Sequence, residues 1–127
     1  MESNVVDGVL TIEGTNEVNG YAGRSDIREV LIQSANRVCK RAFYGCNKLR
    51  SVKLMAVSEV LEEAFAGCGK LKSVFLGPGC TKVGEKAFSG CSKLENLSVP
   101  PTLKSIPSNS VPKQTRILYN KSSESIL

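Results

Sequence analysis

The chain has 127 residues, the length of one ordinary domain, and its formal net charge is +5. It contains no histidine and no tryptophan, which excludes a histidine general base, a histidine-ligated metal and a Ser-His-Asp or Cys-His catalytic set. No apolar run approaches the roughly 20 residues that a membrane-spanning helix needs. The acidic and polar start of the chain also lacks the pattern of a signal peptide, which predicts a cytoplasmic protein or one trimmed from a longer secreted precursor.

The charges are unevenly distributed along the chain. Residues 1–23 hold four acidic residues and no Lys or Arg, whereas residues 24–127 hold all 17 basic residues. Such asymmetry indicates either a distinct N-terminal element or a surface that faces a polyanion.

Residues 1–26 are predicted to form an N-terminal cap, because they lack the repeat that follows them. Within this cap, residues 8–14 predict an edge strand followed by a turn.

A repeat of 22 to 23 residues organises residues 27–111. Its most regular part is a box that begins Ala-Phe, continues through Gly-Cys and ends Lys-Leu, with copies that start at Ala42, Ala64 and Ala87. Each copy leads into a phrase whose apolar residues alternate, as a strand with one buried face requires. These phrases lie at 49–54, 71–76 and 94–99, and an earlier phrase without a box lies at 27–32.

Repeats of this length predict a solenoid. A single unit cannot bury its own apolar face, but stacked copies align each apolar position with its equivalent in the next coil. A second series of apolar residues, Val38, Val60, Val83 and Ile106, keeps the same spacing. We therefore expect about four coils, with parallel strands about 4.8 Å apart.

The last part of the chain departs from the repeat. Pro107 begins a segment that replaces the box, with Val111 where phenylalanine would stand. Residues 112–120 are predicted to form a C-terminal closing strand, centred on 115–119, and the polar residues 121–127 a flexible tail.

The phrase from Val83 to Leu94, followed by Val99 and Pro100, resembles the BspA-like class of leucine-rich repeats. The resemblance covers residues 27–111. It implies a right-handed leucine-rich-repeat solenoid of the α/β type, mostly β, with a parallel sheet on the concave face and short 3-10 or irregular turns on the convex face. It also implies a non-catalytic protein-binding or adhesion module on a cell surface, with host extracellular-matrix proteins such as fibronectin and fibrinogen as the partner class.

The outward positions of the predicted sheet form the candidate partner-binding site. Read across the coils, they give a basic stripe formed by Arg28, Arg50 and Lys72. Beside it lie two apolar residues that are expected to be exposed, Leu31 and Phe75, and this combination is typical of binding hot spots. Lys48, Lys70 and Lys93 flank this stripe. The residues predicted to bind a partner are Arg28, Leu31, Arg50, Lys53, Lys72 and Phe75.

Other interpretations of the stripe stay open at this point. It could bind a polyanion, either a glycan or, less expectedly, a nucleic acid, or it could be a solvated face that keeps the sheet from pairing. A cytoplasmic scaffold is a further alternative, and the ends of a solenoid could pair with a second chain. No enzyme, small-molecule substrate, cofactor or metal is predicted.

The five cysteines have no C-x2-C pair, which disfavours a zinc site, and their odd number leaves one thiol over in any disulfide scheme. Cys46, Cys68 and Cys91 recur with the repeat and are expected to be buried free thiols, as is Cys80. Cys39, at a turn position, is the candidate for an exposed, modifiable thiol.

Overall fold

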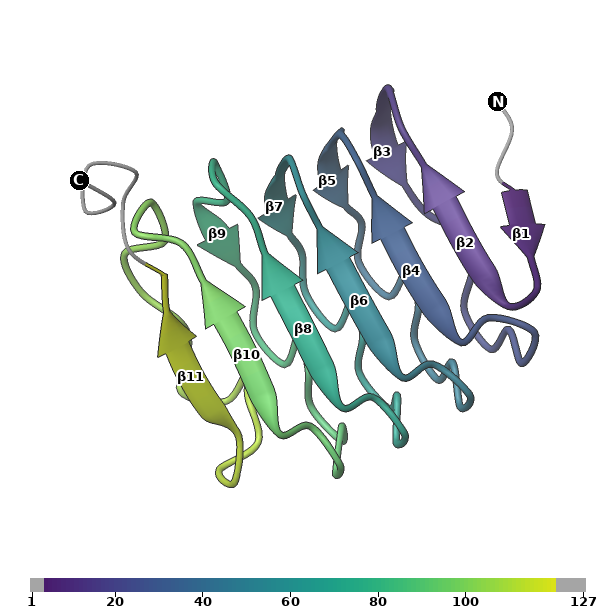
Figure 1. Ribbon diagram of the computed structural model, residues 1–127. Coiled ribbons are helices and arrows are strands. Elements are labelled where there is room, and N and C mark those ends of the chain that lie inside the picture. Colours follow the sequence, from purple (N-terminus) through teal and green to yellow (C-terminus); the bar gives the residue numbers. More distant parts are fainter. Residues whose placement is uncertain (1–3, 121–127) are drawn as a thin grey trace.

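Two β-sheets form the front and back of the molecule in the computed structural model, which describes residues 4–120 (Figure 1). The larger sheet has seven strands in the order β1-β2-β4-β6-β8-β10-β11, and the smaller has four in the order β3-β5-β7-β9. The strands of the larger sheet are β1 (Asn4–Val6), β2 (Val9–Ile12), β4 (Glu29–Ile32), β6 (Ser51–Leu54), β8 (Ser73–Leu76), β10 (Asn96–Val99) and β11 (Arg116–Tyr119). Those of the smaller sheet are β3 (Thr15–Val18), β5 (Ala35–Val38), β7 (Val57–Val60) and β9 (Lys82–Val83).

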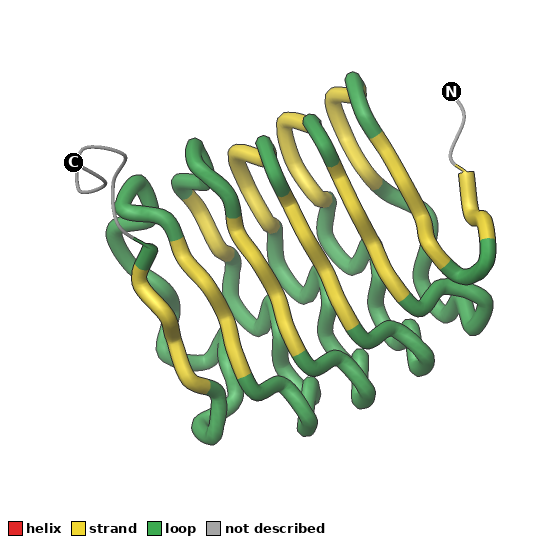
Figure 2. The backbone as a smooth tube through the Cα atoms, in the orientation of Figure 1, coloured by secondary structure: helices red, strands yellow, loops and turns green. Residues whose placement is uncertain are grey.

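Turns and loops connect these strands, and residues 4–120 contain no helix (Figure 2). A helix capable of crossing a membrane is therefore absent from this part of the chain. The turns of the predicted convex side are present, but that side also carries the smaller sheet, which the sequence indicated only as a second series of apolar positions.

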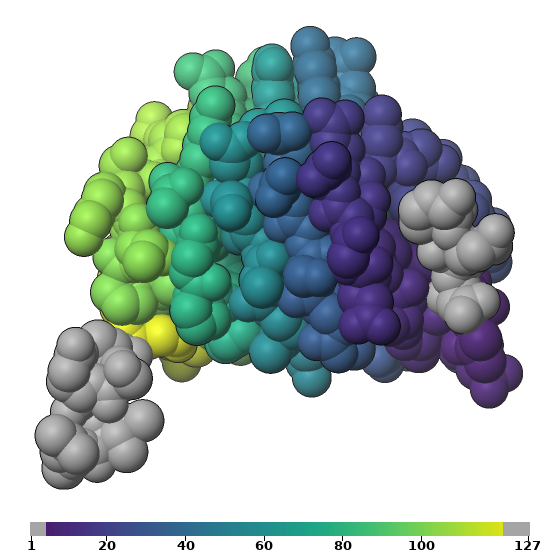
Figure 3. Space-filling view, turned by 90° about the horizontal axis from the view of Figure 1, so that it is seen from above, coloured from purple at the N-terminus to yellow at the C-terminus, as the bar shows by residue number. Residues whose placement is uncertain are grey.

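The chain winds through about five turns of a solenoid, and equivalent residues of successive coils pair with one another. Val30 lies opposite Val52, which lies opposite Val74 on the next strand. In the smaller sheet, Val38 likewise pairs with Val60. The predicted mostly-β, parallel solenoid is confirmed, and its coils follow one another in chain order from one end of the molecule to the other (Figure 3).

The hydrophobic core fills the space between the sheets. Strands of the larger sheet alternate buried and outward residues, so that Ile32, Leu54 and Leu76 are at most 1% exposed. Beside these aliphatic layers, one aromatic ring from each coil forms a continuous stack. Neighbouring rings of Tyr21, Phe43, Phe65 and Phe88 lie 5.1, 5.1 and 5.6 Å apart between centroids and are nearly parallel.

The repeated cysteines fill the corner next to this stack. Their thiols do not form disulfides but donate hydrogen bonds to carbonyl oxygens of the preceding coil. The Cys68 thiol lies 3.2 Å from the Phe43 oxygen, and the Cys91 thiol lies 3.1 Å from the Phe65 oxygen. The Cys46 thiol reaches the Tyr21 oxygen at 3.1 Å in the same way.

Part of the segment predicted as a cap forms a coil of its own. Its strand β2 pairs in parallel with β4, and β3 pairs in parallel with β5. The predicted edge strand at 8–14 is not at the edge, because β1 folds back in an antiparallel hairpin and covers it. Asp7 and Gly8, both with positive φ (52° and 82°), form the tight turn of this hairpin, as an Asp-Gly pair favours.

At the other end, β11 pairs in parallel with β10 and lies within the segment for which a closing strand is predicted. Leu103, Ile106 and Val111 cover the last layer of the core. The division into a cap at 1–26, repeats at 27–111, a closing strand at 112–120 and a tail at 121–127 stays a prediction, and the tail lies outside the described residues.

Candidate binding face

The outer face of the larger sheet brings the predicted basic residues into one row. Backbone hydrogen bonds run from the Arg50 nitrogen to the Arg28 oxygen (2.7 Å) and from the Lys72 nitrogen to the Arg50 oxygen (2.8 Å). The ladder continues from the Glu95 nitrogen to the Lys72 oxygen (2.9 Å). The row is therefore a consequence of strand pairing, and the side chains of its four members are exposed.

Arg28 differs from the other basic residues of this row because its guanidinium contacts the N-terminal hairpin. Its Nη2 donates a hydrogen bond to the Asp7 carbonyl oxygen (2.9 Å), and a Cβ added to Gly8 would lie 2.8 Å from its Nε. Gly8 thus leaves room for Arg28, which holds the hairpin turn against β4. Arg28 is less available to a partner than Arg50 or Lys72.

The two apolar residues of the site, Leu31 and Phe75, are half-buried rather than exposed as predicted. The strand register explains the difference. Lys53 lies directly between them, opposite Leu31 on one side and Phe75 on the other. Side chains directly opposite one another on neighbouring strands are in contact range, and the aliphatic stem of a lysine covers apolar surface. The role of all six predicted residues in binding stays a prediction.

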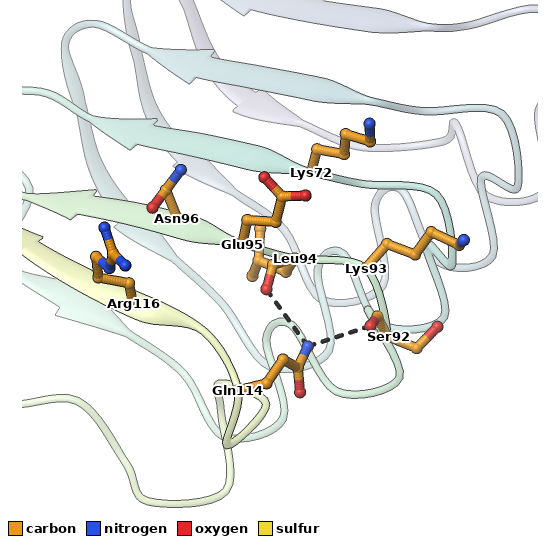
Figure 4. A pocket seen from close by; sticks show the side chains of 8 residues that line it. All are labelled: Lys72, Ser92, Lys93, Leu94, Glu95, Asn96, Gln114 and Arg116. Carbon is orange, nitrogen blue, oxygen red and sulfur yellow. Dashed lines mark hydrogen bonds between the residues drawn. The ribbon is translucent and has the colours of Figure 1, made fainter.

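Two of the hollows at the start of the strands of the larger sheet adjoin one another. One, of about 370 Å³, is lined by Arg50, Lys70, Lys72 and Lys93. The other, of about 660 Å³, lies beside it and shares Lys72 and Lys93. Figure 4 shows these two lysines on one side of the second hollow and Arg116 on the other, with Glu95 between them. Gln114 supports its floor by donating hydrogen bonds to the carbonyl oxygens of Ser92 (3.2 Å) and Leu94 (3.3 Å).

Four basic residues elsewhere in the fold form ion pairs with acidic partners: Arg24, Arg37, Lys40 and Arg41. Arg37, on the smaller sheet, lies between two carboxylates, 2.9 Å from Glu17 and 3.4 Å from Glu59. Arg41 pairs with Glu63 of the next coil at 2.7 Å. In contrast, among residues 4–120, no ion pair involves Arg50, Lys53, Lys70, Lys72 or Lys93.

Asp26, two residues before Arg28, does not neutralise the stripe either. Asp26 forms a two-point ion pair with Arg24, with both contacts at 2.8 Å. This hydrogen bonding lowers the pKa of Asp26 below its ordinary value, so the carboxylate stays charged and committed to Arg24.

Burial suits the described cysteines to structure rather than to chemistry, since Cys46, Cys68, Cys80 and Cys91 are at most 1% exposed. The Cys68 thiol lowers the pKa of Cys91, but the Cys91 side chain has no access to solvent. The pKa of Cys68 is lowered by the Cys46 thiol, but the Cys91 thiol and burial outweigh this effect and raise it to about 12. Cys39, predicted to be exposed, is half-buried, and burial together with Glu17 raises its pKa. A raised pKa lowers the fraction of reactive thiolate. No cluster of acidic or cysteine side chains in residues 4–120 is arranged to hold a metal ion.

The sequence did not predict that Arg50, Lys70, Lys72 and Lys93 line one hollow. Lys70 and Lys93 were placed in a neighbouring row but not among the binding residues, because side-chain direction in a turn does not follow from spacing. The aromatic stack also extends one coil further than expected. Tyr21, Ala22 and Gly23 correspond to Phe65, Ala66 and Gly67, and this match was the available signal.

These features define a leucine-rich-repeat solenoid: short coils, one long parallel sheet and repeated internal ladders of apolar residues. The chain belongs to the BspA-type leucine-rich-repeat family, whose model matches residues 19–126 as six copies. No curated protein shows significant similarity to it.

Solved structures with the same fold are bacterial proteins. A leucine-rich cell surface protein from Faecalibacterium prausnitzii is 25% identical, with a TM-score of 0.78 over 94% of this chain and 34% of that one. A leucine-rich-repeat protein from Eubacterium ventriosum is 18% identical, with a TM-score of 0.59 over 93% of this chain and 41% of that one. A third, from Bacteroides ovatus, is 19% identical, with a TM-score of 0.54 over 84% and 36%. The chain thus spans little more than a third of the length of these proteins.

Proposed function

We propose that the chain is a non-catalytic protein-interaction module and that the outer face of the larger sheet is its binding face. The observation that carries this proposal is the distribution of charge. Arg37 of the smaller sheet is neutralised by two carboxylates, whereas within residues 4–120 no ion pair involves Arg50, Lys53 or Lys72, which lie beside half-buried Leu31 and Phe75. Extended sheet surfaces are the usual binding surfaces of solenoids, and arginine and aromatic residues are frequent hot spots.

Adhesion to an extracellular-matrix protein is the specific form of this function that we propose to test first. Two things support it: the family resemblance, and the description of the F. prausnitzii protein as a cell surface protein. The same face would serve a partner inside the cell equally well. The experiment therefore tests which residues of the chain bind as well as which protein they bind.

The test is surface plasmon resonance on immobilised fibronectin and fibrinogen. We expect the unchanged chain to bind at least one of them. Phe75→Ala and the double variant Arg50→Glu/Lys72→Glu should each weaken binding at least tenfold, about 1.4 kcal/mol. The matched control, Lys82→Glu/Lys86→Glu, changes the net charge equally but lies away from the larger sheet and should change affinity less than twofold. An affinity that neither variant of the face changes would refute the assignment of the binding face.

Polyanion binding is the second candidate, favoured by the lysines around the hollow, which form no ion pair within residues 4–120. A sulfated glycan would bind with an affinity that falls steeply between 50 and 200 mM salt, because binding releases counterions. In that case the charge reversals would abolish binding to immobilised heparin, whereas Phe75→Ala would leave it intact.

A further inference from the structure

The hollow lined by Arg50, Lys70, Lys72 and Lys93 concentrates positive charge from three successive coils. Arg50 and Lys72 precede neighbouring strands of the larger sheet, and Lys70 and Lys93 come from the turns before β8 and β10. All four side chains are exposed, and no acidic residue lines the hollow.

This arrangement differs from an ordinary solvated charged surface. Neighbouring parallel strands are about 4.8 Å apart, so stacked cations repel one another. On the smaller sheet the same stacking places Arg37 between Glu17 and Glu59 and turns repulsion into attraction. The hollow lacks such compensation within residues 4–120, so an anionic ligand would relieve the repulsion as it binds.

The limits of the positive region indicate the size of that ligand. Along the row, Glu95 follows Lys72 on the C-terminal side. On the N-terminal side the row ends at Arg28, whose guanidinium contacts the hairpin turn, and exposed Glu29 is the next residue, on β4. The Glu29 and Glu95 carboxylates lie three strand spacings apart, about 14 Å. A long polyanion crossing the sheet would meet both glutamates, whereas a segment of three or four extended residues would fit between them.

An apolar neighbour distinguishes the region further. Phe75 lies three residues after Lys72, about 10 Å along the strand direction, and its side chain is half-buried. A ligand that carried only negative charge would leave this ring unused. A peptide can place carboxylates over the hollow and an apolar side chain over Phe75.

Building on the proposed function, we propose that this hollow binds a short acidic segment of the partner protein, with its carboxylates over Arg50, Lys70, Lys72 and Lys93. The lysines act as mobile point charges, and the Arg50 guanidinium offers the two-point contact that fits a carboxylate. An apolar residue of the same segment lies over Phe75.

The experiment is an amide NMR titration of the full chain with a capped peptide of three glutamates followed by glycine and leucine. The control peptide has glutamines in place of the glutamates. We expect saturable shifts confined to residues 48–53, 70–75 and 93–96 with the glutamate peptide and none with the glutamine peptide. Lys70→Gln/Lys93→Gln should weaken binding at least fivefold, whereas the equally charged control Lys82→Gln/Lys86→Gln should change it less than twofold.

Three results would overturn the proposal. These are no saturable binding of the glutamate peptide, equal weakening by both double variants, and tighter binding of a heparin hexasaccharide through the same amides at 150 mM salt. The last would identify a sulfated glycan instead. If the peptide fails while a matrix protein still binds in a Phe75-dependent way, the acidic segment is wrong and the protein-binding face stands. If both fail, the proposed function fails too.

Discussion

Cysteine suits the corners of this fold because its side chain is small and largely apolar yet carries one weak hydrogen-bond donor. At the repeated corner, each thiol bonds to a carbonyl oxygen of the preceding coil, as Cys68 does to Phe43. Cys80 occupies a different position, in the apolar series of the smaller sheet, where its equivalent in the preceding coil is Val57. Burial raises the pKa of its thiol.

This raised pKa predicts that Cys80 contributes to a loss of stability at alkaline pH. The unfolded thiol, with an ordinary pKa of about 8.5, releases its proton before the folded one does. Its stabilising contribution is therefore complete below about pH 8.5 and is lost as the pH rises toward the folded-state pKa. Cys80→Val should make the urea-derived unfolding free energy fall less steeply between pH 8.5 and 10, by about 1.4 kcal/mol per pH unit at most. If the unfolding free energy fell equally steeply with pH in both proteins, ionisation of Cys80 would not contribute to the loss of stability.

Among the turns, the one that precedes each Ala-Phe pair is strained. The residue directly before the alanine has a left-handed backbone in three successive coils, at Arg41 (φ 57°), Glu63 (φ 57°) and Lys86 (φ 59°). In the first coil, the residue with positive φ is Gly20 (φ 94°), one position later, directly before Tyr21. Residues with a Cβ lose about 1–2 kcal/mol in this conformation, and glycine does not. The Arg41–Glu63 ion pair offsets part of this cost in two of the coils.

Lys86 lacks such compensation among the described residues, and so Lys86→Gly should stabilise the protein. We expect a gain of about 1 kcal/mol, reduced by the greater freedom of glycine in the unfolded chain. Lys86→Ala removes the same side chain but keeps the strain and should give no gain. Urea denaturation of the three proteins provides the comparison, and equal stability of the two variants would show that the backbone conformation is not the cause.

Strand pairing was predictable because it follows directly from the constant spacing of the repeat, as the pairing of Val52 with Val74 illustrates. The first coil was not recognised because its spacing changes. The step along the chain from Val18 to its partner Val38 is shorter than the step from Tyr21 to Phe43, on which it stacks. The additional length enters the turn between β5 and Phe43, and a search at one fixed step misses such a coil.

The candidate site was predictable only in part, and for a related reason. Positions in a row follow from the register, so Arg50 and Lys72 could be placed together from spacing alone. The contribution of Lys70 and Lys93 depends on how a turn directs its side chains, and the half-burial of Phe75 depends on its neighbours across the sheet. Neither is encoded in the period of the repeat.

At the scale of the whole molecule, stability is distributed along one axis, because each coil contacts only the coils beside it. Central coils have a neighbour on both sides. The first coil has β1 as a short antiparallel cover, and at the other end Leu118 and Tyr119 of β11 are exposed (39% and 76%).

This organisation predicts a gradient in amide hydrogen exchange. Local opening costs less where a coil has one neighbour than where it has two. Amides of β6 and β7 should therefore exchange slowest, and those of β1 and β11 at least tenfold faster, in native-state exchange followed by NMR. Uniform protection across all strands would instead indicate that the coils unfold only as a single unit.

The constant length of the central coils has a consequence for how such a chain can change over generations. Between β4 and β8 the backbone repeats its pairing at one unchanged step, as the series Ile32, Leu54 and Leu76 shows. Recombination that removes or duplicates one whole repeat would leave every buried layer in register, whereas loss of a single position within a strand would turn its buried side chains outward. The number of repeats can therefore change without disturbing the packing of the core, and the width of the sheet face changes with it.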